Sequence, residues 1–321
     1  MNSFGIEARK LGVAPTLQAQ FPILRQTALN LLGVTTGSPS SIVRSSETNR
    51  KERRTSSCLV GVAMDQDTLL SEVEGKGQSM TFRDICTFRL MLAYIYGDLN
   101  TMANMIETLS EFPVDNPMVV RVLFRRAFTA LAAYSLSRKS KTRKTRYKFR
   151  KIANREFNYF KQTAKKGSVN ACPVYALLLA ERYPSKQRYD EAIRICCRSG
   201  FKNFEAIAFE CCGSWLSEKN KRHNNIDDHY WASVYLSQSV QRYLEWEAIG
   251  KAEQLREKYS TILMDSDSTT SSTIENNNMS SVFGTSFRGK KVHQDDVVAK
   301  MKALHLDDMA ILSPSKNVNA A

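Results

Sequence analysis

Residues 88–109 of the chain read FRLMLAYIYGDLNTMANMIETL, and this stretch decides the fold class. Apolar side chains surround much of the segment 81–96, as expected of a helix with neighbours on both sides. Gly97 then ends that helix, and a second helix is expected over 99–110 because its apolar residues recur along one face. The stretch therefore predicts two antiparallel helices joined by a tight turn.

The same apolar periodicity continues along the chain. It predicts further helices over 17–33, 117–136, 149–167, 172–183, 189–197, 204–216, 230–246 and 248–263. No segment alternates like a strand, and only 14 Gly and 8 Pro occur among 321 residues, which also favours helix. Successive hairpins that bury their faces against one another are typical of an all-α, tetratricopeptide-like α-solenoid, which is the predicted fold.

Composition divides the chain into four parts. Residues 1–33 form an N-terminal helix that belongs to the helical region, and residues 34–57 have too few apolar side chains to fold and are expected to be a flexible linker. The helical-repeat domain spans 58–263. Residues 264–321 are expected to be a mostly disordered tail, with a short amphipathic helix at 295–306.

The cysteines and the apolar segments indicate the cellular environment. Seven cysteines, an odd number, lie mostly inside helical patterns, where a free thiol packs as a small apolar group, and this favours a reducing compartment. No segment has the length of uninterrupted apolar sequence that crosses a bilayer, and the first residues lack the pattern of a secretory signal. We therefore expect a cytoplasmic protein, and the local basic run described below leaves a nuclear location open.

Motifs for catalysis and cofactors are weak. Residues 284–290 read GTSFRGK and fit seven positions of a phosphate-binding P-loop, but Lys291 occupies the eighth, where Ser or Thr must reach magnesium. No serine-hydrolase elbow, kinase motif, zinc-protease motif or dinucleotide fingerprint is present. The sequence therefore predicts no enzyme, no catalytic residues and no cofactor.

Two groups of residues could suggest a metal. The pairs Cys196-Cys197 and Cys211-Cys212 have no residues between them, whereas zinc ligands are usually separated by two to four, so core packing is the expected role. His223 and His229 lack the spacing of four that places two imidazoles on one helical face. We expect no metal site.

The charge of the chain is concentrated in one place. Of the net charge of +14, residues 138–166 carry most, with thirteen Lys or Arg against one Glu. The basic patch comprises Arg138, Lys139, Lys141, Arg143, Lys144, Arg146, Lys148, Arg150 and Lys151. Three interpretations stay open: a solvated helix end, a site for an acidic protein or a membrane, and a site for nucleic acid. Phe149, Phe157 and Phe160 fall on the buried seam of the helix and are not expected to stack on bases.

Several segments resemble one family. They are QFPILRQTALNLLG at 20–33, VAMDQDTLL at 62–70, residues 88–109, GSVNACPVYALLLAE at 167–181, YDEAIRICCRSGFKNFEAIAFECCGSWL at 189–216 and YWASVYLSQSVQRYLEWEAIGKAEQLREKY at 230–259. Together they resemble the C-terminal helical region of large multidomain signalling proteins, in which a kinase-like domain and a P-loop ATPase precede the helices and a histidine kinase or cyclase follows. The resemblance implies a tetratricopeptide-like superhelix that couples neighbouring domains and has no catalytic residues of its own.

The function predicted from these observations is a non-enzymatic scaffold for protein partners in intracellular signalling, stand-alone or as a piece of a sensor kinase. The partner is expected on the concave helical surface, and the residues expected to line or support that surface are Tyr94, Asn104, Tyr175, Arg194 and Tyr235. The alternative is an RNA- or DNA-associated helical-repeat protein that uses residues 138–151 on phosphates.

Overall fold

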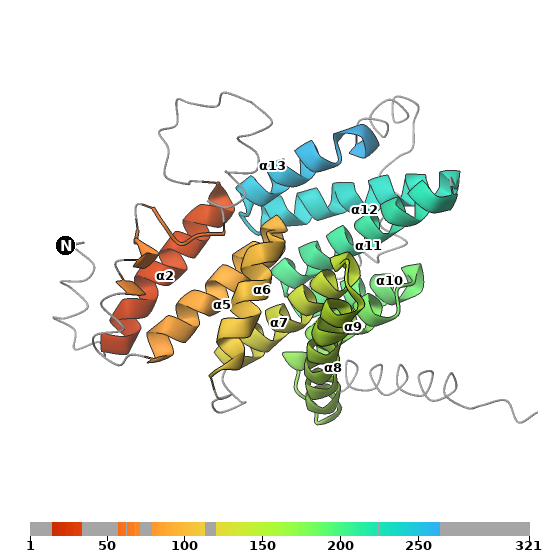
Figure 1. Cartoon of the computed structure of the whole chain (residues 1–321). Helices are drawn as coiled ribbons and strands as arrows, with labels where there is room; N and C mark the ends of the chain where they lie inside the picture. Colours follow the sequence, from red (N-terminus) through yellow and green to blue (C-terminus); the bar gives the residue numbers. More distant parts are fainter. Residues whose placement is uncertain are drawn as a thin grey trace, which may run out of the picture.

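A computed structural model of the chain is all-helical (Figure 1). It describes residues 15–33, 57–61, 63–67, 69–70, 79–112, 120–223 and 225–263, of which 84% are helical. These residues contain no strand, only an isolated bridge between Val60 and Asp65. The predicted all-α class is confirmed. The predicted linker up to residue 56, the tail at 264–321, the short helix at 295–306 and the P-loop-like segment lie outside the described residues.

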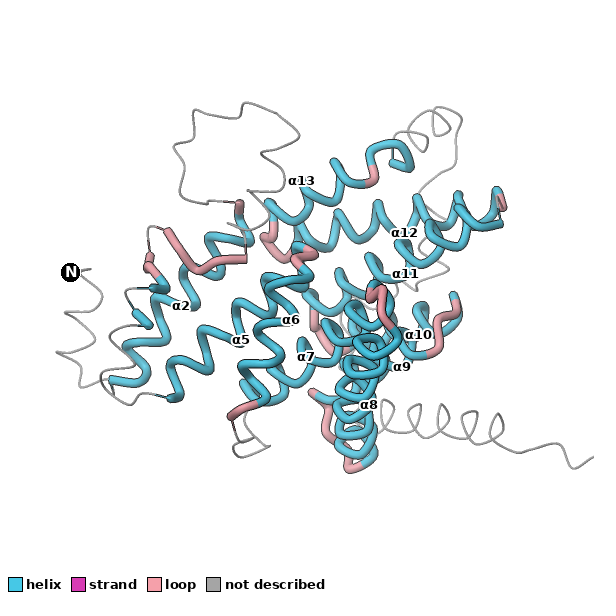
Figure 2. The backbone as a smooth tube through the Cα atoms, in the orientation of Figure 1, coloured by secondary structure: helices cyan, strands magenta, loops and turns pink. Residues whose placement is uncertain are grey.

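Ten named helices make up the described fold, and short loops join most of them (Figure 2). They are α2 (Pro15–Leu32), α5 (Ser79–Tyr96), α6 (Leu99–Ser110), α7 (Val120–Lys139), α8 (Arg143–Lys165), α9 (Ala171–Arg182), α10 (Lys186–Arg198), α11 (Lys202–His223), α12 (Ile226–Glu245) and α13 (Ile249–Lys258). Four hairpins follow one another: α5–α6, α7–α8, α9–α10 and α11–α12.

Local sequence sets the ends of these helices. The Asp98 carboxylate accepts the backbone N–H of Thr101 at 3.1 Å and begins α6, and the Ser185 hydroxyl begins α10 in the same way. Such side chains satisfy N–H groups that have no partner within the helix. Gly97 and Gly200 adopt positive φ after α5 and α10, a conformation that glycine reaches without strain.

The helix α8 begins earlier than the apolar pattern predicts. The pattern predicts a helix over 149–167, but α8 begins at Arg143, because Thr142 caps it. Long basic side chains are good helix formers, so charge density alone does not interrupt a helix that has a buried apolar seam. Phe149, Phe157 and Phe160 are buried on that seam, as predicted.

The hairpins pack in sequence, and the chain then returns on itself. The first helices α5, α7, α9 and α11 lie side by side, while α13 packs against both α2 and α5 at the other end of the chain (Figure 1). In an open solenoid each repeat contacts only its neighbours. The return of α13 therefore adds long-range contacts that an open solenoid lacks.

Two glycines permit the contact between α2 and α13. A Cβ built on Gly250 would lie 2.7 Å from the Cα of Gly33, which follows α2 with a φ of 85°. A larger side chain at residue 250 would push the two backbones apart. The Tyr96 hydroxyl lies beside this contact and donates to the carbonyl of Asn30 at 2.7 Å.

Candidate functional site

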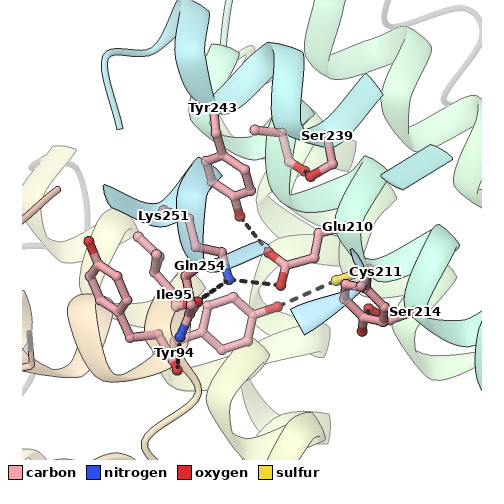
Figure 3. A network of polar contacts seen from close by, with 12 residues as sticks. Tyr94, Ile95, Glu210, Cys211, Ser214, Ser239, Tyr243, Lys251 and Gln254 are labelled. Carbon is pink, nitrogen blue, oxygen red and sulfur yellow. Dashed lines mark hydrogen bonds and ion pairs between the residues drawn. The ribbon is translucent and has the colours of Figure 1, made fainter. Parts of the chain in front are cut away.

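A buried polar cluster lies where α5, α11 and α13 meet (Figure 3). Lys251 of α13 has a side chain only 2% exposed. Its Nζ donates to the carbonyl oxygen of Ile95 at 2.6 Å, to Glu210 Oε1 at 2.8 Å and to Gln254 Oε1 at 3.2 Å (Figure 3). Because a buried ammonium needs such acceptors, Lys251 fixes α13 against α5 and α11.

Glu210 receives a second donor in the same cluster. The Tyr243 hydroxyl of α12 donates to Glu210 Oε2 at 2.7 Å. Burial raises the pKa of the Glu210 carboxyl, but the Lys251 ammonium and these hydrogen bonds outweigh burial and hold the pKa below its ordinary value. Glu210 is therefore ionised at neutral pH, and four helices are joined through one ion pair.

A second ion pair, with a buried carboxylate, joins α7 to α9. Arg138 Nη2 lies 2.5 Å from Glu181 Oε2, and the Tyr189 hydroxyl donates to Glu181 Oε1 at 2.8 Å. Glu181 is buried, whereas the Arg138 side chain is 46% exposed. Arg138 was predicted as part of the basic patch, but its charge is paired with the buried carboxylate of Glu181.

Burial disfavours the thiolate form of two cysteines, Cys211 and Cys86. Cys211 Sγ lies 3.5 Å from the Tyr94 hydroxyl, and burial, with Glu181 next, raises the pKa of this thiol well above its ordinary value. Burial also raises the pKa of the Cys86 thiol, to about 11. Since the thiolate is the nucleophile and the metal ligand, the arrangement favours packing over chemistry.

The described part of the chain contains no cluster of three or more His, Cys, Asp or Glu residues arranged to bind a metal ion. Among the same residues, no helix combines the length and the apolar character that crossing a bilayer requires. Cys196 and Cys212 are buried in the core, while their neighbours Cys197 and Cys211 are exposed and half-buried. Adjacent residues of a helix point about 100° apart, so one thiol of each pair faces the core and its neighbour is less buried.

The five residues predicted to line a partner surface do not lie together. Tyr94 lies in the buried cluster, next to Cys211. Tyr175 and Tyr235 are buried in the core, where Tyr235 donates to Asp190. Asn104 and Arg194 are exposed on α6 and α10, and Arg194 pairs with Glu191 of its own helix.

The rest of the predicted basic patch divides into two groups. Lys148 pairs with Glu107 of α6, and Arg146 Nη2 donates to the carbonyl of Ser140 at 3.3 Å. The second group forms no ion pair with a carboxylate of the described residues. Its members are the exposed residues Lys139, Lys141, Arg143, Lys144, Arg150 and Lys151.

We define the α8 basic face as Arg143, Lys144, Tyr147, Arg150 and Lys151. All five residues are exposed, and the four cations form no ion pair with any carboxylate in the described part of the chain. The one acidic residue of α8 is Glu156, which is buried and paired with Arg126 and Arg155. The cationic charge of this face is therefore not neutralised by the described residues.

Sequence patterns did not assign roles to Lys251, Glu210 and Tyr147. Lys251 lies in the segment 230–259 that carries the family resemblance, and its position between the buried residues Ala248 and Ala252 is the signal that could have identified it. Tyr147 could have been identified by helical spacing, because it falls on the face opposite the seam residue Phe149.

Comparisons with known proteins identify no relative, since no family model, curated protein or solved structure matches the chain. The resemblance to multidomain signalling proteins therefore stays a prediction.

Proposed function

We propose that the protein is a non-enzymatic, tetratricopeptide-like interaction module that binds a polyanionic partner through the α8 basic face. A role within intracellular signalling, as the resemblance implies, belongs to the same proposal. The observation that carries it is the contrast between α8 and the interior: buried charges are paired, whereas Arg143, Lys144, Arg150 and Lys151 are exposed and have no carboxylate partner among the described residues.

Cations at this density act together on a partner. The helix α8 carries nine Lys or Arg against one Glu, and the four cations of the α8 basic face lie within about 12 Å of one another along the helix axis, which is comparable to the screening length at physiological salt. Their potentials therefore add at the surface and attract an extended polyanion more strongly than single surface charges do. The core side of α8 keeps the helix in place, because Phe149, Phe157 and Phe160 are buried against its neighbours.

The buried cluster supports a binding role over catalysis. Glu210 and Lys251 hold each other inside the protein, and Glu181 is held by Arg138 and Tyr189. Groups engaged in this way stabilise a rigid arrangement of helices. A rigid arrangement presents the α8 basic face in one geometry and lowers the entropic cost of binding.

Heparin, a polyanion without bases, tests the proposal. The quadruple variant Arg143→Gln/Lys144→Gln/Arg150→Gln/Lys151→Gln should lose most heparin affinity at about 150 mM salt. The matched control replaces four exposed cations elsewhere by Gln: Lys165, Lys166, Lys221 and Arg222. Both variants lose four positive charges, so they differ in place and not in net charge. Equal affinities for the two variants would show that net charge, and not this face, binds heparin.

A further inference from the structure

The α8 basic face contains one aromatic ring, that of Tyr147. Its side chain is 71% exposed, whereas the aromatic residues on the other side of α8 are buried. Residues three and four positions away on a helix are neighbours on its surface. For Tyr147 these positions hold Arg143, Lys144, Arg150 and Lys151, so four cations surround the exposed ring.

Anionic membranes, acidic peptides and nucleic acids all complement the positive charge of the α8 basic face, but the exposed ring of Tyr147 distinguishes among them. A helix that lies in a membrane interface presents a broad apolar face to lipid, and the apolar face of α8 is buried in the core. An acidic peptide would neutralise the cations with carboxylates and would leave the ring without a partner of its own. A single-stranded nucleic acid offers both phosphates for the cations and bases that stack on an aromatic side chain.

We propose that the α8 basic face binds single-stranded nucleic acid, with one base stacked on Tyr147 and neighbouring phosphates on the two cation pairs. This inference rests on the proposed function and names its partner. The pair Arg143 and Lys144 lies seven residues from the pair Arg150 and Lys151, which is about 10 Å along the helix. That length spans about three stacked nucleotides at roughly 3.4 Å each, so one base faces Tyr147 while its neighbours' phosphates face the cations.

The test measures fluorescence anisotropy of a labelled, unstructured RNA of about 12 nucleotides at about 150 mM salt. Tyr147→Ala should weaken RNA binding by about 5- to 150-fold, the range for loss of one stacked base, and should leave heparin affinity unchanged. Tyr147→Phe keeps the ring and should bind RNA like the wild type. Tyr230→Ala removes another exposed tyrosine, on α12, and should also bind normally.

Salt dependence provides a second readout. The quadruple Gln variant should reduce the slope of log affinity against log salt by about 3, since each phosphate contact on a single strand contributes about 0.7. This measurement counts the cations that contact phosphates and does not depend on Tyr147.

Some outcomes overturn the inference alone. One is an unchanged RNA affinity in Tyr147→Ala, and the others are tighter binding to poly-glutamate, or to phosphatidylserine vesicles, than to RNA. After any of these outcomes the α8 basic face is still a polyanion site, provided that heparin binding depends on the four cations. If the wild type bound none of the four ligands (heparin, RNA, poly-glutamate and these vesicles), the proposed function itself would be overturned. Circular dichroism of each variant distinguishes these outcomes from loss of folding.

Discussion

Replacing Lys251 by Met tests whether the buried ion pair fixes the returning helix α13 in place. The substitution keeps an unbranched apolar stem and removes the ammonium. Three acceptors then lose their donor: the Ile95 carbonyl, Glu210 and Gln254. Glu210 retains the hydrogen bond from Tyr243, but its negative charge has no cation in contact.

The expected loss is large because the pair is buried. The Lys251 side chain is 2% exposed and that of Glu210 is 17% exposed, so water compensates little for the missing charge. Removing one partner of a buried ion pair costs about 3–5 kcal/mol. For a domain of this size, that corresponds to a fall in melting temperature of roughly 6–20 °C.

Urea unfolding followed by circular dichroism measures the free energy of unfolding, and a double-mutant cycle isolates the pair. In Lys251→Met/Glu210→Gln no uncompensated charge is left, so the double variant should be at least as stable as Lys251→Met alone. A Lys251→Met variant as stable as the wild type, or strictly additive losses in the cycle, would show that the ion pair does not hold α13 to α5 and α11.

Three further predictions concern packing, thiols and pH. Gly250→Ala should destabilise the protein by about 1–3 kcal/mol in thermal unfolding, because the new Cβ would clash with Gly33. Ala is intrinsically the better helix former by about 1 kcal/mol, so a variant more stable than the wild type would show that the two backbones are not in close contact. In the native protein Cys197 should react first with a thiol reagent, as mapped by mass spectrometry, and prior reaction of a buried cysteine would refute the packing. Because the pKa of Glu210 is lowered in the fold, its ionised form stabilises the protein above about pH 4.3 and this stability is lost as the pH falls through the folded pKa. The stability gap between wild type and Glu210→Gln, from urea unfolding, should therefore narrow from pH 7 to about pH 3, and a widening gap would contradict the lowered pKa.

Helix positions followed from the sequence because their cause is local. Apolar spacing and glycine stops predicted α5 and α6 almost to the residue, and the seam of α8 was assigned correctly. The start of α8 differs from the prediction, because Thr142 caps the helix two turns before its first buried apolar residue, Phe149. Capping is also local, so residues 140–145 themselves carry the signal for this start.

The arrangement of helices and the site depend on contacts between distant residues. The pairing of Lys251 with Glu210 joins residues 41 positions apart, and the contact of Lys251 with Ile95 spans 156. Apolar periodicity indicates that a face is buried but not which helix covers it. For the same reason Tyr94, Asn104 and Arg194 seemed to share one surface, whereas the structure places them in the interior, on α6 and on α10.

Lysine footprinting tests most directly whether the α8 basic face is the binding surface. The full chain is acetylated briefly with and without heparin, and again with and without RNA, and each lysine is quantified by mass spectrometry. We predict that Lys144 and Lys151 are protected by either ligand, while the exposed residues Lys165, Lys221 and Lys258 react as in the free protein. If Lys258 were protected while Lys144 and Lys151 were not, the result would contradict binding through the α8 basic face.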